Sequence, residues 1–221
     1  MTASAPGLDG VQALFFDLDG TLVDSAADIH RSLNLALIHL GLSQVSAAQV
    51  RDWVGRGASR LVACVLQHLH QPMARHDELL AHFLSLYQAQ VCVDSTVYPG
   101  VLVCLQRAQA RGLHLACITN KPYRPAVDLL RALQLEDFFA LILGGDSLTH
   151  KKPHPQPLQH ALAHFGLQPH QALMVGDSRN DVEAAHAAGM RCVAVPYGYN
   201  HGEDVRSCQP DHLLDSLEFL L

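Results

Sequence analysis

The segment Ala13–Ser25 constrains the possible folds of this chain more than any other stretch. The apolar run Ala13–Phe16 leads directly into Asp17-Leu18-Asp19-Gly20-Thr21. Polar side chains at the carboxyl end of a buried strand lie at the edge where open α/β sheets bind ligands. Gly20 permits the sharp turn that must follow. We therefore expect a buried strand that brings Asp17 and Asp19 to one site, and the alternative is a plain polar turn that caps the next helix.

Beyond residue 97, apolar runs typical of buried strands alternate with helical patterns. The expected strands are Leu113–Thr119, Phe139–Leu143, Ala172–Val175 and Cys192–Val195. The expected helices, several of which stop at a glycine, are Val101–Arg111, Pro125–Leu133, Gln156–Phe165 and Asn180–Ala188. Strands separated by helices form βαβ units, in which the strands are parallel. The sequence therefore predicts an α/β fold with a Rossmann-like parallel sheet as its core.

Residues 25–93 show helical patterns and no strand pattern of any strength. Apolar residues at helical spacing predict helices over about 29–40, 59–68 and 77–90. Ser46-Ala47-Ala48-Gln49 has the form of a capping box that opens a further helix. We expect this segment to be an all-helical cap inserted after the first strand. The predicted division is a core domain of residues 1–23 and 97–221 and a cap domain of residues 24–96.

Reactive side chains stand at the carboxyl ends of three expected strands. Asp17 and Asp19 follow the first strand, Thr119 and Asn120 follow the second, and Asp177 follows the run that begins at residue 172. Because parallel strands share this edge of a sheet, we expect these residues to meet at one site.

The three aspartates would gather negative charge with little to neutralise it. Such a cluster favours a bound cation, and Mg²⁺ suits carboxylate oxygens and phosphate together. Cys and His are missing from these strand ends, which argues against zinc or copper. The alternative for Asp177 and Asp181 is a helix cap and a first-turn acid that the helix dipole favours.

Several of these segments resemble the motifs of the haloacid dehalogenase-like hydrolases. Asp17-Leu18-Asp19-Gly20-Thr21 is similar to the first motif, Asp-x-Asp-Gly-Thr, and Ile118-Thr119-Asn120 is similar to the second. Lys152, within Lys151–Pro155, matches the third motif, while Lys151 reads as part of an exposed basic loop. The resemblance covers nearly the whole chain and is closest to members with a helical cap after the first motif.

This resemblance implies a role for each matching residue. Asp17 would be the nucleophile that attacks phosphorus, and Asp19 would be the general acid and base. The expected phosphate-binding residues are Thr119, Asn120 and Lys152, and the expected Mg²⁺ ligands are Asp17, Asp19 and Asp177. Asp181, Thr21 and Ser178 would support the site. The implied activity is Mg²⁺-dependent phosphomonoester hydrolysis through an aspartyl phosphate.

Other activities fit the sequence less well. A dehalogenase of this superfamily has no acid two residues after its nucleophile, whereas this chain has Asp19. A phosphonate hydrolase needs a lysine in the cap, and residues 25–93 contain none. A non-catalytic phosphate-binding or regulatory module is a further alternative, but the complete set of reactive residues argues against it.

The substrate is expected from finer details of the resemblance. Thr119–Pro122, Gly176–Asp181, Tyr197–Asn200 and the cap loop Trp53–Gly57 look most like the phosphoglycolate phosphatases of the family. Sugar phosphates, nucleotides and pyrophosphate are alternative substrates, because related enzymes hydrolyse them with the same core. If the substrate is 2-phosphoglycolate, the planar guanidinium of Arg56 is suited to its carboxylate. The alternative is that Arg56 is a solvated residue in a turn between helices.

Composition limits the partners and the compartment. The formal charge of −6 over 221 residues disfavours nucleic acid and anionic membranes, which need a basic face. The first ten residues lack the pattern of a signal peptide, and six widely spaced cysteines without a Cys-x-x-Cys pair favour reduced thiols. We expect a cytoplasmic enzyme with a small-molecule phosphomonoester substrate, as a monomer or a homodimer.

Overall fold

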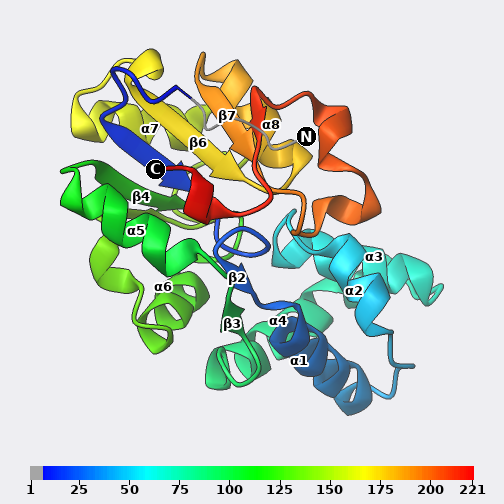
Figure 1. The fold of residues 1–221 in the computed structure, drawn as a ribbon. Helices are drawn as coiled ribbons and strands as arrows, with labels where there is room; N and C mark the ends of the chain where they lie inside the picture. The colour runs from blue at the N-terminus through cyan, green and yellow to red at the C-terminus, as the bar shows by residue number, and fades with distance from the viewer. Residues whose placement is uncertain (1–6) are drawn as a thin grey trace.

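The computed structural model describes residues 7–221. It has two parts, a parallel sheet flanked by helices and a group of helices next to the carboxyl ends of the strands (Figure 1). The main sheet has the order β5-β4-β1-β6-β7-β8, and its neighbouring strands pair in parallel. Its strands are β1 Ala13–Phe16, β4 His114–Ile118, β5 Leu141–Leu143, β6 Ala172–Gly176, β7 Arg191–Ala194 and β8 His212–Leu213. The α/β fold class expected from the sequence is confirmed.

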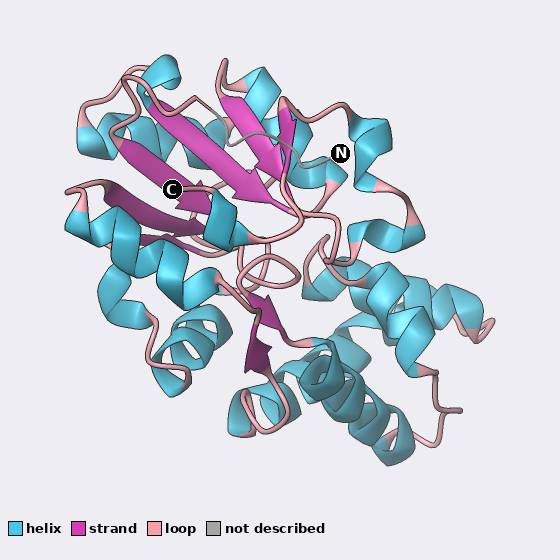
Figure 2. Ribbon diagram, viewed as in Figure 1, coloured by secondary structure: helices cyan, strands magenta, loops and turns pink. Residues whose placement is uncertain are grey.

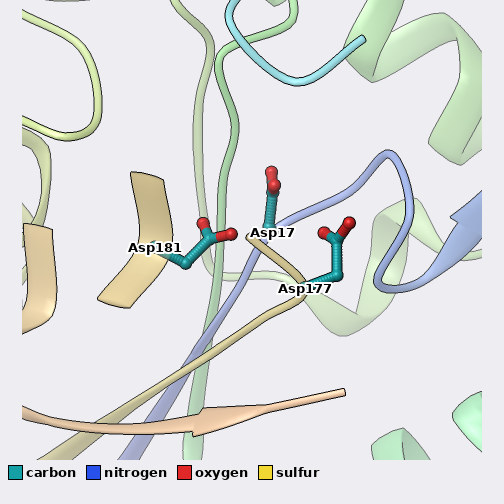
Figure 3. A group of neighbouring side chains, drawn as sticks. All are labelled: Asp17, Asp177 and Asp181. Atoms are coloured by element: carbon teal, nitrogen blue, oxygen red, sulfur yellow. The ribbon is translucent and has the colours of Figure 1, made fainter. Parts of the chain in front are cut away.

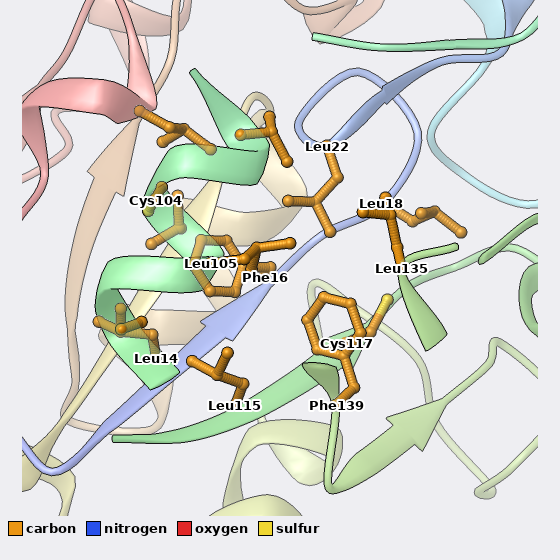
Figure 4. Close-up of a cluster of buried hydrophobic side chains, with 14 of the residues drawn as sticks. Leu14, Phe16, Leu18, Leu22, Cys104, Leu105, Leu115, Cys117, Leu135 and Phe139 are labelled. Atoms are coloured by element: carbon orange, nitrogen blue, oxygen red, sulfur yellow. The ribbon is translucent and has the colours of Figure 1, made fainter. Parts of the chain in front are cut away.

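Strand β1 lies in the middle of the sheet because it is apolar on both faces. Leu14 and Phe16 face one cluster of buried side chains, which includes Leu105 (Figure 4), and Ala13 and Phe15 face the other. All four residues of the strand are completely buried. Alternate side chains of one short strand therefore join the two halves of the core.

Helices cover both faces of this sheet (Figure 2). The helices of the core are α5 Val101–Ala110, α6 Tyr123–Ala132, α7 Gln156–Phe165 and α8 Arg179–Ala187. Side chains of α5 and α6 belong to the cluster around Phe16, and those of α7 and α8 belong to the cluster around Phe15. The two layers of helices explain why the strands lack the alternation of a half-exposed sheet.

Four helices form the cap. They are α1 Ala26–His39, α2 Ala47–Trp53, α3 Ala58–His68 and α4 His76–Ala89, and α1 and α4 pack together closely. The cap has its own buried cluster, in which Leu33, Val62 and Leu79 are completely buried. The capping box expected at Ser46 and Gln49 is present, and α1 begins slightly earlier than expected because Ala26 and Ala27 add little to an apolar pattern.

The chain passes between the two parts twice, and these passages lie side by side. Strand β2 Val23–Asp24 pairs antiparallel with β3 Thr96–Val97, and Figure 1 shows this pair between the sheet and the cap. The 3₁₀-helices are Met73–Arg75, Glu136–Phe138, Pro169–Gln171, Asn200–Gly202, Val205–Cys208 and Leu217–Phe219. Among residues 7–221, no helix has the length and apolar character needed to cross a membrane.

Candidate active site

The site is built at the carboxyl ends of β1, β4 and β6, on the side of the sheet that faces the cap. Asp17, Thr119 and Asp177 are the residues that follow these three strands, and each is buried. The amide of Asp17 donates to the carbonyl of Val175, and the amide of Thr119 donates to that of Leu143. The hydrogen bonding of the sheet therefore extends to the reactive residues and fixes their backbone.

Three carboxylates gather at this edge. Asp17, Asp177 and Asp181 each offer an oxygen within 4.8 Å of the others (Figure 3). Thr21 Oγ1 and the Tyr199 amide each donate to Asp177 at 2.8 Å and fix its orientation. The group fits a hard cation, because all of its donors are oxygen atoms.

Asp181 serves two purposes in the structure. Its Oδ2 accepts hydrogen bonds from the amide and the hydroxyl of Ser178, which completes a capping box at the start of α8. Its Oδ1 faces the site, 2.6 Å from Lys152 Nζ. The sequence assigned Asp181 and Ser178 supporting roles, and the structure places the Asp181 carboxylate within the acidic group itself.

The acidic group carries more negative charge than its surroundings neutralise. Burial raises the pKa of Asp17 to about 7, with Asp181 adding to the rise and Lys152 opposing it. Burial also raises the pKa of Asp177 to about 8, and the carboxylates of Asp181 and Asp17 add to it. A divalent cation bound among these oxygens would supply the missing positive charge and release the protons.

Lys152 is the cation closest to the expected nucleophile. Its Nζ lies 3.0 Å from Asp17 Oδ1 as well as contacting Asp181, and its side chain is almost completely buried. Burial lowers the pKa of Lys152, but the two carboxylates more than offset this effect, so that the pKa is raised and the group stays charged. The carbonyl of Lys152 accepts from Asn120 Nδ2 at 2.8 Å, which joins two of the expected phosphate-binding residues.

Asp19 lies in a different environment from Asp17, two residues away. Its carboxylate accepts a hydrogen bond from the Ser25 hydroxyl, and both of its oxygens contact Lys121 Nζ, at 3.0 and 3.1 Å. It is not a member of the acidic group that the structure brings together, although the sequence placed it among the metal ligands. Gly20 makes this turn, with φ at 89°, and a Cβ there would lie 2.3 Å from an oxygen of Asp177.

Sequence reasoning missed two residues of the site, Lys121 and Tyr199. Both lie within segments that resemble the family, but the resemblance assigned no role to either residue. Lys121 pairs with Asp19, and the Tyr199 hydroxyl accepts the amides of Ser25 and Ala26 where the chain enters the cap. A lysine two residues after the end of a strand was the available signal for Lys121.

A cavity lies between the core and the cap above these residues. Its core side is polar and is lined by Asp17, Asp19, Thr119, Asn120 and Lys121. Its cap side is largely apolar and includes Ile29, Val54, Leu61, Phe83, Leu84 and Tyr87. The cavity therefore combines a polar surface suited to a small anion with a wall that keeps bulk water away.

The cap loop Trp53–Gly57 reaches the site through its backbone. The carbonyl of Gly55 accepts hydrogen bonds from Asn120 Nδ2 at 3.0 Å and Asn180 Nδ2 at 3.2 Å. Gly55 and Gly57 line the cavity, but Arg56 between them is exposed and does not line it. A contact between Arg56 and a substrate in the cavity would therefore need a different arrangement of the cap loop.

Known proteins with similar sequences and structures share this architecture. A family model described as haloacid dehalogenase-like hydrolase matches residues 14–195. A phosphoglycolate phosphatase of Yersinia pestis is 42% identical over 216 residues, which are 96% of this chain and 92% of the relative. The crystal structure of a predicted phosphoglycolate phosphatase from Haemophilus somnus 129PT has a TM-score of 0.89 at 36% identity, and covers 95% of this chain and 96% of that one.

A more distant structure, CbbY from Rhodobacter sphaeroides in complex with phosphate, has a TM-score of 0.77 at 27% identity. The match covers 94% of this chain and 95% of that one. The matched residues include β4 to β7, nearly all of β1, the cap and every aspartate of the acidic group. The chain therefore belongs to the haloacid dehalogenase-like hydrolases.

Proposed function

We propose that this protein is a Mg²⁺-dependent phosphatase that hydrolyses 2-phosphoglycolate to glycolate and phosphate. The observation that carries the proposal is the pairing of buried Asp17 with Lys152 beside two further carboxylates. A nucleophilic carboxylate needs a neighbouring cation to accept an anionic phosphoryl group, and Lys152 is already in contact with it. The choice of 2-phosphoglycolate as the substrate is supported by the similar proteins described as phosphoglycolate phosphatases.

In the first step, a carboxylate oxygen of Asp17 attacks phosphorus in line with the ester oxygen. The bond from phosphorus to that oxygen breaks, and the leaving oxygen takes a proton from Asp19. In the second step, Asp19 removes a proton from a water molecule that attacks the aspartyl phosphate. Phosphate leaves, and Asp17 and Asp19 return to their starting states.

The remaining residues bind the phosphoryl group. Thr119 donates from its hydroxyl and Asn120 from its backbone amide, because both N–H groups of the Asn120 side chain already donate to the carbonyls of Gly55 and Lys152. Lys152 neutralises charge on the phosphoryl group and on Asp17. Mg²⁺, held by Asp17 and Asp177 with Asp181 next to them, would stabilise the negative charge that develops on the phosphoryl oxygens. Asp19, paired with Lys121 outside this group, is left available for proton transfer.

A contact of Arg56 with the substrate carboxylate is proposed only for a cap loop that has moved. Because its side chain is exposed, the cap loop would have to turn inward before its guanidinium reached the cavity. The connections near Asp24 and Thr96 are the proposed hinges for such a movement. All six cysteines lie within the described residues and are free, which supports the proposal of a cytoplasmic enzyme. Its proposed oligomeric state is a monomer or a homodimer.

The proposal is tested by measuring kcat/KM for a panel of phosphomonoesters with Mg²⁺ and after chelation. We expect 2-phosphoglycolate to have the highest value, above sugar phosphates, nucleotides and pyrophosphate. Hydrolysis of other phosphomonoesters with no preference for 2-phosphoglycolate would overturn the substrate but leave the chemistry standing. A folded protein that hydrolyses none of them would overturn the enzymatic proposal and favour the binding-module alternative.

A further inference from the structure

Lys121 is a buried lysine on the polar core side of the cavity. Its side chain is 4% exposed, and its Nζ contacts both oxygens of Asp19 while lying 4.5 Å from the centre of the Tyr87 ring. Lysines are almost never buried to this degree without a partner. An ammonium has three N–H donors, and Asp19 accepts two of them. The Tyr87 side chain contacts the ammonium from another side, and Asp19 is the acidic partner of Lys121 at this position.

The charges around the cavity single out this lysine. Among the described residues that line the cavity, Lys121 is the one cationic side chain. Lys152 contacts Asp17 but does not line the cavity. Arg56 is exposed and does not line the cavity either. A substrate that carries a second anionic group into this apolar space needs a cation there, because an unpaired buried charge is strongly unfavourable.

The position of Lys121 fits a carboxylate close to the ester bond. In 2-phosphoglycolate the carboxylate carbon is two covalent bonds from the ester oxygen, which is the atom that Asp19 protonates. A group that contacts both Asp19 oxygens is therefore next to the place where this carboxylate would lie. The amide of Lys121 also donates to Thr119 Oγ1 at 3.2 Å, which ties the lysine to the proposed phosphate-binding residue.

We propose that Lys121 is the residue that selects a substrate with a carboxylate next to the phosphoester. In the free enzyme, Asp19 is the carboxylate that pairs with its ammonium. In the complex, the substrate carboxylate accepts a hydrogen bond from this ammonium and shares its positive charge with Asp19, while the Tyr87 ring covers another side. The inference rests on the proposed function, because it assumes that Asp17 and Asp19 act on a phosphoester.

The test compares 2-phosphoglycolate with its neutral carboxamide, 2-phosphoglycolamide, which has nearly the same shape. Lys121→Met keeps an unbranched side chain that is one heavy atom shorter and removes its charge. Both substrates should lose rate because Asp19 loses its partner, but we expect kcat/KM for 2-phosphoglycolate to fall at least about 20-fold more than that for the carboxamide, the scale of losing one partner of a desolvated charge pair. The wild-type preference for the acid should almost disappear.

Two further variants complete the design. Lys151→Met removes a charge from a partly exposed lysine that does not line the cavity, and it should leave the preference for the acid unchanged. Lys121→Arg should retain much of the preference, because it restores a cation. If Lys121→Met does not fold, Lys121→Gln supplies the neutral side chain with polar atoms for the buried position.

Each outcome decides the question. Equal losses on the two substrates would overturn the inference, because Lys121 would then act through Asp19 alone. An unchanged preference in the neutral variants would overturn it as well. If wild type hydrolyses other phosphomonoesters and shows no preference for 2-phosphoglycolate over the carboxamide, the proposed substrate fails; if wild type has the preference and Lys121→Met keeps it, the inference alone fails.

Discussion

The cavity has a floor, which is its core side, and a wall, which is its cap side, and the two are made of opposite kinds of side chain. The core supplies a floor of charged groups in direct contact, with Lys152 beside Asp17 and Lys121 beside Asp19. The cap supplies apolar side chains and the carbonyl of Gly55. The floor can bind any phosphoryl group through charge, whereas the wall excludes water and limits what is attached to that group.

The floor itself contains a second contrast, between Asp17 and Asp19. Asp17 lies among carboxylates where burial raises its pKa, and Asp19 is held by an ammonium and a hydroxyl. Two residues on one turn therefore meet environments suited to different tasks, nucleophilic attack and proton transfer. Substitutions that change a charged residue of the floor should alter kcat and kcat/KM strongly. Substitutions in the exposed part of the cap loop should alter them weakly.

Asp17→Asn should produce the largest effect. An amide is a poor nucleophile and a weak metal ligand, so we expect kcat to fall by at least about four orders of magnitude, where each ~1.4 kcal/mol of barrier is tenfold. Steady-state kinetics with protein free of wild-type enzyme, and circular dichroism to verify folding, provide the measurement. Asp9→Asn, at an exposed position, is the matched control and should be active. Substantial activity of Asp17→Asn would rule out the covalent mechanism.

Removal of Mg²⁺ should abolish activity and leave the fold intact. The acidic group lies at the edge of the sheet, outside the hydrophobic clusters, so the metal is not needed to hold the core together. Activity after EDTA treatment and after added Mg²⁺, together with circular dichroism, tests this expectation. Beryllium fluoride with Mg²⁺ should inhibit by imitating phosphorylated Asp17. Full activity after thorough chelation would contradict the proposed metal site.

The sequence predicted the floor better than the wall. Asp17, Thr119 and Asp177 meet because each follows a strand of one parallel sheet, and periodicity is enough to identify those strands. The catalytic and metal-binding roles of these residues stay predictions. Their placement at one edge is an observation that the sequence anticipated.

The details that the sequence did not give depend on contacts between distant segments. Asp181 joins the acidic group because the capping of α8 fixes its side chain. Asp19 turns to Lys121 because the cap residue Tyr87 and Ser25 enclose the pair. The exposure of Arg56 follows from how the Gly55 carbonyl docks on two asparagines of the core. Local patterns do not report such tertiary contacts.

Asp177→Asn should stabilise the metal-free protein while abolishing its metal-dependent activity. The folded-state pKa of Asp177, about 8, is above its ordinary value of 3.8, so ionisation of this group disfavours folding increasingly as pH rises between these values. Removing the charge should therefore add roughly 1–2 kcal/mol at pH 8, or several degrees in Tm, in EDTA.

The same variant should show almost no gain near pH 3, where Asp177 is largely protonated in both states. With saturating Mg²⁺ the order should reverse, because bound metal stabilises wild type alone. Thermal unfolding at two pH values, with EDTA and with Mg²⁺, measures all of these differences. A variant less stable than wild type in EDTA at pH 8 would show that Asp177 contributes to stability through its hydrogen bonds with Thr21 and Tyr199.

Arg56→Ala should have the smallest effect, and it tests whether the wall moves. Had the guanidinium bound the substrate carboxylate, its loss would cost roughly 2–4 kcal/mol in kcat/KM for 2-phosphoglycolate. In the structure, Arg56 is exposed, and the carbonyl of Gly55 before it is already held by two amides. We therefore expect a loss below about threefold, within the range of ordinary surface substitutions. The measurement is kcat/KM for 2-phosphoglycolate and for an aryl phosphate that has no carboxylate.

A large loss confined to 2-phosphoglycolate would show that the cap loop turns inward and that Arg56 shares the substrate carboxylate with Lys121. An equal loss on both substrates would assign Arg56 to the cap or the phosphate site instead.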